Sequence, residues 1–454
     1  MVYSKDSFLN DLDGSVEIGE GGVSVRDKER VRGELIDRLI YNACLNPDEE
    51  IRNAVRWLIR EIAKDLGIFP ASIFAYYSEK PENLSVPAIN IRGLTYDVAR
   101  AVFSSAKADN IGAFIFEIAR SEMEYTYQEP AEYSTLIMAA GIKEGWTGPV
   151  FIQGDHFQIR KKIENDIENV KGLIKKAVEA GFYNLDLDTS TLVDLSQPNV
   201  YEQQRKNFET AAELTRFVRS IEPKEITVSL GGEIGEIGKQ NSTEEELREY
   251  LKGYKESLGK ELVGLSKMAI QTGTAHGGVV LPDGSIAAVK LDFDTLSKLG
   301  KIARDDYNLG GCVQHGASTL PLELFDKFPA SYTIEVHLAT EYQNITYELI
   351  PESLREEVYA YLRTHCQSEK KETDTDEQFI YKARKKGFGP FKEKFWGLNE
   401  GVKAEIRDKL TEKFTFTFDK LGVKNTQGVI SQLIKPAYQQ KPIPELLKYL
   451  PKLK

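Results

Sequence analysis

Histidine is scarce in this chain, and three of its five histidines follow short apolar runs. His156 stands in GDH, His276 in GTAHGG and His315 in QHGAS, while a carboxylate, Glu233, follows another run in GGEIGEIG. Imidazole nitrogens and carboxylate oxygens are ligands that suit zinc or a similar divalent ion. These four residues could form one metal site if the fold brings the runs together. The alternative is that each histidine is a hydrogen-bonded structural residue.

Eight short apolar runs recur from residue 86 onward, and a longer helical pattern separates most of them. The runs cover residues 86–90, 113–119, 149–156, 184–190, 225–235, 267–273, 311–317 and 333–339. Near-continuous apolar runs are typical of parallel strands that are buried on both faces. The alternation predicts an α/β fold, a (β/α)8 TIM barrel, in which the carboxyl ends of the strands share one face. An open, doubly wound sheet is the alternative, but no GxGxxG follows the first strand and no P-loop occurs.

Helical patterns and glycines fill the segments between these runs. Apolar residues repeat every three or four positions from Ile159 to Ala177, which predicts a helix that ends near Gly181. Residues 26–66 are also predicted to be helical, with Pro47 dividing the segment into two helices. Glycines beside the candidate ligands, at positions 154, 231, 232, 277 and 316, suggest that the backbone approaches a ligand or an anion there, or simply turns.

The pattern divides the chain into three predicted regions. These are a helical N-terminal extension (1–83), the barrel with the metal site (84–345) and a mainly helical C-terminal extension (346–454). A basic cluster at residues 382–386 precedes Gly387 in the last region. The simplest interpretation is that this region packs on the barrel or on a neighbouring subunit.

Composition excludes several classes of protein. The 454 residues include 70 acidic and 59 basic ones, a net charge of −11, which argues against a dedicated nucleic-acid-binding protein. The three cysteines, Cys44, Cys312 and Cys366, form neither a disulfide framework nor a CxxC metal motif. Because we find neither a signal peptide nor a membrane-spanning apolar run, we predict a cytoplasmic protein with no membrane partner.

Seven motifs, in order, resemble those of the class II, metal-dependent fructose-bisphosphate and tagatose-bisphosphate aldolases. They are VPAINI, GDHFQ, LDLDTSTL, GGEIGEIG, IQTGTAHGG, KLDFDTLSKL and QHGAS. The chain is identified as a divergent member of this family. The resemblance implies one divalent ion per chain, with Zn²⁺ expected, held by His156, Glu233, His276 and His315. It also implies a homodimer or homotetramer.

The resemblance further implies an activity and roles for particular residues. The expected reaction cleaves a ketose (bis)phosphate, such as the fructose 1,6-bisphosphate of glycolysis, to dihydroxyacetone phosphate and an aldehyde through a metal-stabilised enediolate. Asp155 matches the carboxylate that polarises or protonates the aldehyde carbonyl, and Asn90 matches an asparagine near the substrate. Asp188 matches a supporting residue behind the site. The positions that match phosphate-binding groups are Gly277, Gly316 and Ser318.

Two departures from the family pattern concern the substrate and the proton carrier. The family has Asn-Ile-Asp-Thr-Asp on strand eight, where this chain has residues 337–341, and we predict Thr340 as a substrate contact there. The acid–base glutamate aligns with Asn241, which cannot titrate. We therefore predict Glu236 as the proton carrier, with His337 as the alternative. Glu245 is expected to cap a helix with Ser242 instead.

Two other functions remain open at this point. The same metal chemistry could serve a sugar (phosphate) epimerase or isomerase. Some relatives of these aldolases are non-catalytic partner subunits, although the chain retains all four metal positions.

Overall fold

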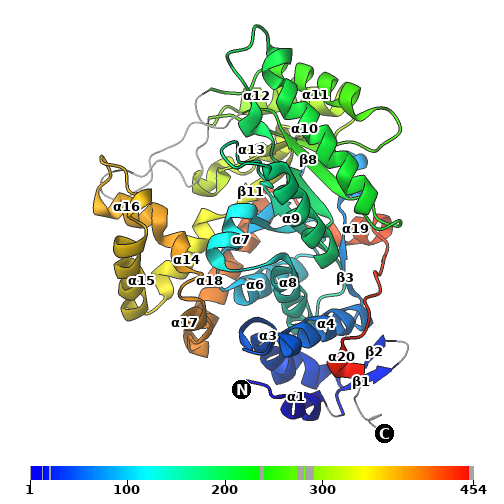
Figure 1. Cartoon of the computed structure of the whole chain (residues 1–454), viewed down its shortest axis with the longest axis vertical. Helices are drawn as coiled ribbons and strands as arrows, with labels where there is room; N and C mark the ends of the chain where they lie inside the picture. The colour runs from blue at the N-terminus through cyan, green and yellow to red at the C-terminus, as the bar shows by residue number, and fades with distance from the viewer. Residues whose placement is uncertain are drawn as a thin grey trace.

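The computed structural model describes residues 2–12, 14–19, 22–235, 240–273, 281 and 291–448 (Figure 1). It confirms the predicted TIM barrel, because each of the eight apolar runs contains one strand and each strand pairs in parallel with its neighbours. Pairing of the last strand with the first closes the ring. The strands are β4 (Val86–Asn90), β5 (Ile115–Ala119), β6 (Gly148–Asp155), β7 (Asn184–Leu187), β8 (Ser229–Glu233), β9 (Lys267–Ile270), β10 (Cys312–Gln314) and β11 (Thr333–Leu338).

Helices connect these strands on the outside of the barrel. They are α6 (Thr95–Ala108), α7 (Arg120–Thr126), α8 (Pro130–Glu144), α9 (Asp166–Ala180), α10 (Val200–Ile221), α11 (Glu244–Leu258), α12 (Phe293–Asp305), α13 (Lys327–Ala330) and α14 (Thr340–Leu349). Helix α9 ends at Gly181 as predicted, where φ is +97°. The predicted start of α9 was wrong. Ile159 and Ile163 both lie in the loop before the helix, where Ile159 is buried and Ile163 is exposed. The cap of α11 is Thr243 with Glu246, one residue later than expected.

The N-terminal region combines the predicted helices with three strands that were not predicted. Its elements are α1 (Lys5–Leu12), β1 (Val16–Gly19), β2 (Gly22–Val25), α2 (Lys28–Arg30), a π-helical turn (Val31–Leu35), α3 (Ile36–Leu45), α4 (Glu49–Asp65), β3 (Ile68–Ala71) and α5 (Phe74–Ser78). The break at Pro47 is confirmed, since it lies between α3 and α4. Strand β3 pairs with the first half of β6, and β7 pairs with its second half. The N-terminal region therefore shares the sheet of the barrel.

The C-terminal region packs against the barrel and reaches the N-terminal helices. Its helices are α15 (Glu352–His365), α16 (Asp376–Ala383), α17 (Lys392–Trp396), α18 (Glu400–Lys420), α19 (Gln427–Leu433) and α20 (Glu445–Lys448). Helix α18 packs against α6 and α14, and α20 lies against α4 beside the N-terminal helices (Figure 1). Backbone bonds, such as Ser85 N to Leu421 O at 2.9 Å, join this region to the barrel. The predicted boundaries after residues 83 and 345 stay predictions.

None of the helices in the described ranges is long and apolar enough to cross a membrane.

A short 3-10 turn, Arg384–Gly387, carries all of the predicted basic cluster except Lys382, which lies on α16, and it packs against α7 and α15. Close packing holds this turn in place. A Cβ atom at Gly387 would lie 2.4 Å from Val358 Cγ1, and one at Gly93 would lie 2.1 Å from the ring of Phe388. Both glycines are needed because the neighbouring segments of the chain lie too close together for a side chain to fit between them.

We expect Gly93→Ala to destabilise the protein by about 1–3 kcal/mol, because the new methyl group overlaps the buried Phe388 ring. Urea unfolding measures the change. The control is Gly172→Ala on the exposed face of α9, where no atom lies within 4 Å of the new Cβ and where alanine favours the helix. An unchanged unfolding midpoint for Gly93→Ala would contradict the packing described.

Candidate functional site

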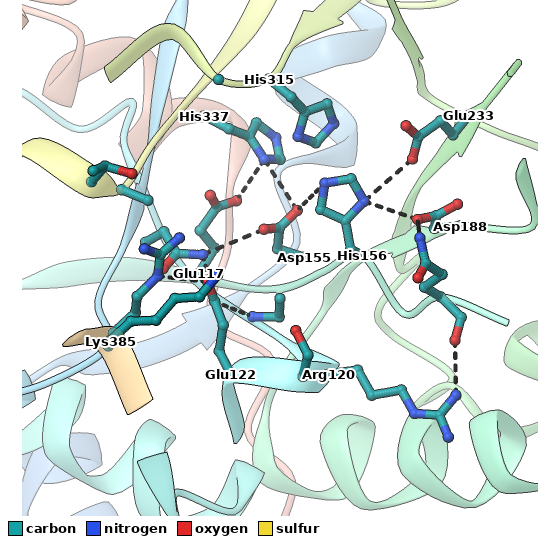
Figure 2. A pocket seen from close by; sticks show the side chains of 18 of the residues that line it. Glu117, Arg120, Glu122, Asp155, His156, Asp188, Glu233, His315, His337 and Lys385 are labelled. Atoms are coloured by element: carbon teal, nitrogen blue, oxygen red, sulfur yellow. Dashed lines mark hydrogen bonds and ion pairs between the residues drawn. The ribbon is translucent and has the colours of Figure 1, made fainter. Parts of the chain in front are cut away.

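A cavity of about 450 Å³ opens at the carboxyl ends of the barrel strands (Figure 2). Most of the predicted site residues line it, although they are far apart in the sequence. They are Asn90, Asp155, His156, Glu233, His315, Gly316, Ser318, His337 and Thr340. The predicted residues Glu236, His276 and Gly277 lie outside the described residues.

His156 stands at the centre of the candidate metal site. It directly follows β6 with a φ of +41°, a strained backbone conformation that is uncommon for a residue with a side chain. Its Nδ1 lies 3.0 Å from Asp188 Oδ2. Asp188 is itself held by Ser190 Oγ at 2.6 Å and Gln158 Nε2 at 2.7 Å. Asp188 therefore orients the His156 ring, as carboxylates commonly do for metal-binding histidines.

Two overlapping groups of potential ligand atoms share His156. One contains Asp155, His156 and His315, and the other contains His156, Asp188 and Glu233. The His156 and His315 rings lie 4.3 Å apart, and His156 Nδ1 lies 3.3 Å from Glu233 Oε2. The structure thus brings together three of the four predicted ligands, His156, Glu233 and His315. Glu233 belongs to one of the two groups and His315 to the other. The complete ligand set remains a prediction.

The donor set fits a divalent cation. Glu233 Oε1 is buried and accepts no hydrogen bond within the described part of the chain. Burial, followed by the charge of Asp188, raises the pKa of Glu233 to about 7. A cation bound beside this oxygen would stabilise the carboxylate and supply the missing partner. These buried clusters of histidine and carboxylate groups are consistent with a metal site.

A second polar cluster lies inside the barrel, beneath the cavity. We call it the interior cluster; its members are Glu117, Gln153, Asp186, Lys267, Glu335 and His337. Lys267 Nζ lies 2.9 Å from Asp186 Oδ1 and also pairs with Glu335. Lys267 therefore supplies a buried cation to Asp186 and Glu335, within a group of ligand atoms that are also close enough together to hold a metal ion.

His337 joins the interior cluster to the cavity. Its Nε2 lies 2.6 Å from Glu335 Oε1, and its Nδ1 lies 3.1 Å from Glu117 Oε2 and 3.2 Å from Asp155 Oδ1. Burial alone would lower the pKa of His337, but the charge of Glu117 and the hydrogen bonds to Asp155 and Glu335 raise it well above its ordinary value. Burial, followed by the charge of Asp155, raises the pKa of Glu117 to about 8.

Several of the glycines serve packing rather than ligand approach. A Cβ atom at Gly231 would lie 2.2 Å from Asp186 Oδ1, so this glycine makes room for the interior cluster. One at Gly154 would lie 2.5 Å from the Phe157 ring, and one at Gly232 would lie 2.7 Å from Leu265. Gly316 lines the cavity and has a φ of +70°.

Sequence reasoning missed most of the basic residues around the cavity. Its basic lining residues are Arg92, Arg120, Arg160 and Lys385. Arg120 forms two hydrogen bonds of 2.7 Å with Asp166, whose pKa this pairing lowers to about 2. The sequence marked Lys385 only as part of a basic cluster. Glu117 and Glu335 were also missed, although a carboxylate inside an apolar run was a usable signal.

Comparison of the sequence with known protein families identifies the family of this chain. A sequence profile described as "Fructose-bisphosphate aldolase class-II" matches residues 76–395, which is more than half of the chain. The chain belongs to this family. The match spans the barrel and extends through the turn that carries Lys385. No protein of curated function matches the chain significantly.

Solved structures that resemble this class II aldolase-family chain support the barrel fold. A probable tagatose 6-phosphate kinase from Sinorhizobium meliloti is 14% identical, with a TM-score of 0.53 over 77% of this chain and 93% of that one. A fructuronate-tagaturonate epimerase from Cohnella laeviribosi is 15% identical, with a TM-score of 0.51 over 76% of this chain and 83% of the other. At these identities the similarity shows the fold alone.

The raised pKa of Glu233 makes the stability of the metal-free protein depend on pH. Between the ordinary value of 4.5 and about 7, the folded state retains a proton that the unfolded state has lost. The contribution of Glu233 to the free energy of unfolding is therefore complete below pH 4.5. It is lost as pH rises through about 7, by up to about 1.4 kcal/mol per pH unit. We expect Glu233→Gln to remove this slope in urea unfolding with a chelator present.

The matched control is Glu164→Gln, at an exposed position outside the cavity. It should retain the wild-type slope. If Glu233→Gln and the wild-type protein lose stability equally from pH 5 to pH 8, the assignment of this raised pKa to Glu233 is wrong.

Proposed function

We propose that this chain is a class II, metal-dependent aldolase. It would cleave a ketose (bis)phosphate, such as fructose 1,6-bisphosphate, to dihydroxyacetone phosphate and an aldehyde. The observation that carries this proposal is the convergence of His156, His315 and Glu233 on one cavity in a chain of this family. Zn²⁺, a role in glycolysis, a cytoplasmic location and a homodimer or homotetramer are the corresponding expectations.

The proposed metal would be held by His156, His315, Glu233 and His276. A divalent ion bound there supplies Lewis-acid stabilisation of the negative charge that develops on the ketone fragment. Asp188 keeps the His156 ring in position through its 3.0 Å contact with Nδ1. Its pKa stays below the ordinary value because hydrogen bonds from His156, Ser190 and Gln158 outweigh the effect of burial.

Other residues would orient the sugar. Asn90 donates from Nδ2 to Glu122 Oε2 at 2.7 Å, and its buried Oδ1 accepts no hydrogen bond from any described residue. This oxygen is therefore available for a substrate hydroxyl. Near the end of β11, Ser318 Oγ accepts a hydrogen bond from Thr340 N at 3.2 Å, and both residues line the cavity. We propose that Ser318, with Gly277 and Gly316, contacts the phosphate beside the ketone, and that Thr340 contacts the substrate nearby.

A sugar (phosphate) epimerase or isomerase is the second candidate. Asn241, which aligns with the acid–base glutamate of the aldolases, is exposed and donates to Asp292 Oδ2 at 2.8 Å. Because its side chain is an amide, which does not titrate, Asn241 cannot supply the proton transfer that cleavage requires. His337 and Asp155 lie 3.2 Å apart at the base of the cavity and offer a different pair of proton-transfer groups.

Product analysis distinguishes these functions. With Zn²⁺ supplied, we expect the wild-type protein to release an aldehyde from a ketose bisphosphate. NMR spectra of the reaction mixture would identify the product. His156→Ala and His315→Ala should reduce bound metal and turnover by orders of magnitude, because each removes a proposed ligand. The control is His365→Ala, an exposed histidine on α15 that should leave both unchanged.

Each other outcome has a distinct meaning. A new hexose without cleavage would favour the epimerase. Absence of any product from metal-loaded protein across ketose mono- and bisphosphates would contradict both enzymes and favour a non-catalytic subunit. Full metal occupancy in both histidine variants would remove the proposed metal site.

The proton carrier is tested by exchanging titratable groups for amides of similar size. We propose Glu236 for this role, with His337 as the alternative. Glu236→Gln should lower turnover by about 10²-fold or more while metal content stays unchanged, as expected for loss of a general base. If turnover survives in Glu236→Gln but collapses in His337→Gln, the proton carrier is His337.

A further inference from the structure

We propose that a cavity on the outside of the barrel, where the C-terminal segment meets α4, binds a small organic anion with an apolar body. The ligand would be an aromatic carboxylate or an aromatic phosphate ester. The cavity has a volume of about 280 Å³ and shares no lining residue with the cavity at the strand ends, so this inference is independent of the proposed function. We call it the outer cavity. Its lining comes from α4, β3, α8, the end of α9 and residues 441–444.

The first support is the way in which the chain builds the outer cavity. Residues 434–444, which we call the strap, run from α19 to α20 as the red segment of Figure 1. The ring of Tyr438 packs against that of Phe69, with the centroids 5.8 Å apart. Trp57 Nε1 donates to Lys441 O at 3.3 Å, and α20 then packs on α4. Because the strap is anchored before, at and after Lys441, ordering of this lysine on ligand binding costs less than that of a surface lysine.

The second support is the charge of the lining. Three charged residues line the outer cavity, and all of them are basic: Arg56, Arg60 and Lys441. Arg56 pairs with Glu132 at 3.3 Å, whereas Arg60 donates to the backbone oxygen of Glu179 at 3.4 Å. Neither Arg60 nor Lys441 has a carboxylate within ion-pair distance among the described residues. Two half-buried positive charges therefore lack an ion-pair partner there.

The third support is the surroundings of the Lys441 ammonium group. Burial, followed by the positive charge of Arg60, lowers the pKa of Lys441 to about 8, although the carboxylate of the exposed Glu179 opposes this shift. An anionic group bound beside both cations would relieve their repulsion and accept hydrogen bonds from them. The outer cavity therefore favours an anion over a neutral ligand of the same shape.

The fourth support is the apolar part of the lining, which selects the rest of the ligand. Trp57 and Met138 are almost completely buried, and Pro70, Pro442 and Pro444 also line the outer cavity. Inorganic phosphate gains nothing from such a surface, whereas an aromatic ring is removed from water when it packs against it. An anionic group attached to a ring therefore matches both parts of the lining.

Calorimetric titration of the full-length protein, stripped of metal by a chelator, tests this site without measuring turnover. The probes are benzoate and phenyl phosphate, which carry the two kinds of anionic group, and benzamide is the neutral control ligand. We expect at least one anion to bind, and benzamide to bind at least about 10-fold more weakly because it lacks the charge. Lys441→Met and Arg60→Met should each weaken anion binding by about 10-fold or more, since each removes one cation.

The matched control variant is Lys435→Met. Lys435 is an exposed residue of the strap that does not line the outer cavity, so its loss should leave anion binding unchanged. Lys441→Arg retains the charge and should restore much of the binding, and thermal unfolding of each variant checks the fold. Failure of both anions to bind at millimolar concentration, or equal binding by folded Lys441→Met, would overturn the proposal. An equal loss in Lys435→Met would also overturn it, because the effect would then be general charge attraction.

Limited proteolysis provides a second measurement on the unmodified protein. Chymotrypsin cleaves after aromatic residues, and Tyr438 in the strap is 40% exposed. An anion that joins Lys441 to Arg60 on α4 should slow release of the C-terminal fragment several-fold, whereas benzamide should not. If a bound anion leaves this cleavage rate unchanged, the anion binds elsewhere and the proposed site is wrong.

Discussion

The buried ammonium group of Lys267 holds the charged interior of this barrel together. It pairs with Asp186 and Glu335 and donates to Gln153 Oε1 at 2.7 Å, although the lysine is completely shielded from solvent. TIM barrels usually fill this space with layers of branched apolar side chains. Carboxylates there lose their hydration, and only a paired cation and a full set of hydrogen bonds offset that cost. Burial opposes the charge of Lys267, but its two acidic partners keep its pKa above the ordinary value.

This interior ion pair shapes the cavity above it through His337. The imidazole lies between Glu335, which pairs with Lys267, and Asp155 at the base of the cavity. Burial raises the pKa of Asp155, but the charge of His156 and the hydrogen bond from His337 outweigh it and hold that pKa well below its ordinary value. A carboxylate that stays ionised beside the candidate metal ligands attracts cations. The chemistry available at the strand ends is therefore determined partly by side chains one layer below them.

The charged groups around the cavity come from different parts of the chain. Carboxylates and imidazoles arrive on β6, β8, β10 and the segment after β7, so the barrel itself presents them. The basic turn with Lys385 arrives from the C-terminal region and depends on α7, α14 and α15 for its position. Barrel enzymes vary their specificity through segments at this face, whereas the strands retain the central site. The separate origins of the barrel ligands and of Lys385 follow that pattern.

The sequence alone determined the barrel and most of the candidate ligands. Buried parallel strands require continuous apolar runs, and all eight runs proved to be strands, so His156, Glu233 and His315 could be placed on one face. It did not determine strand β3, the late start of α9 or the pairing of Lys267 with Glu335, nor did it place Lys385 in the cavity. Hydrophobic periodicity records which residues avoid water within one element. Charge pairing inside the barrel and the approach of a distant turn depend on contacts between elements, and only the tertiary structure decides those.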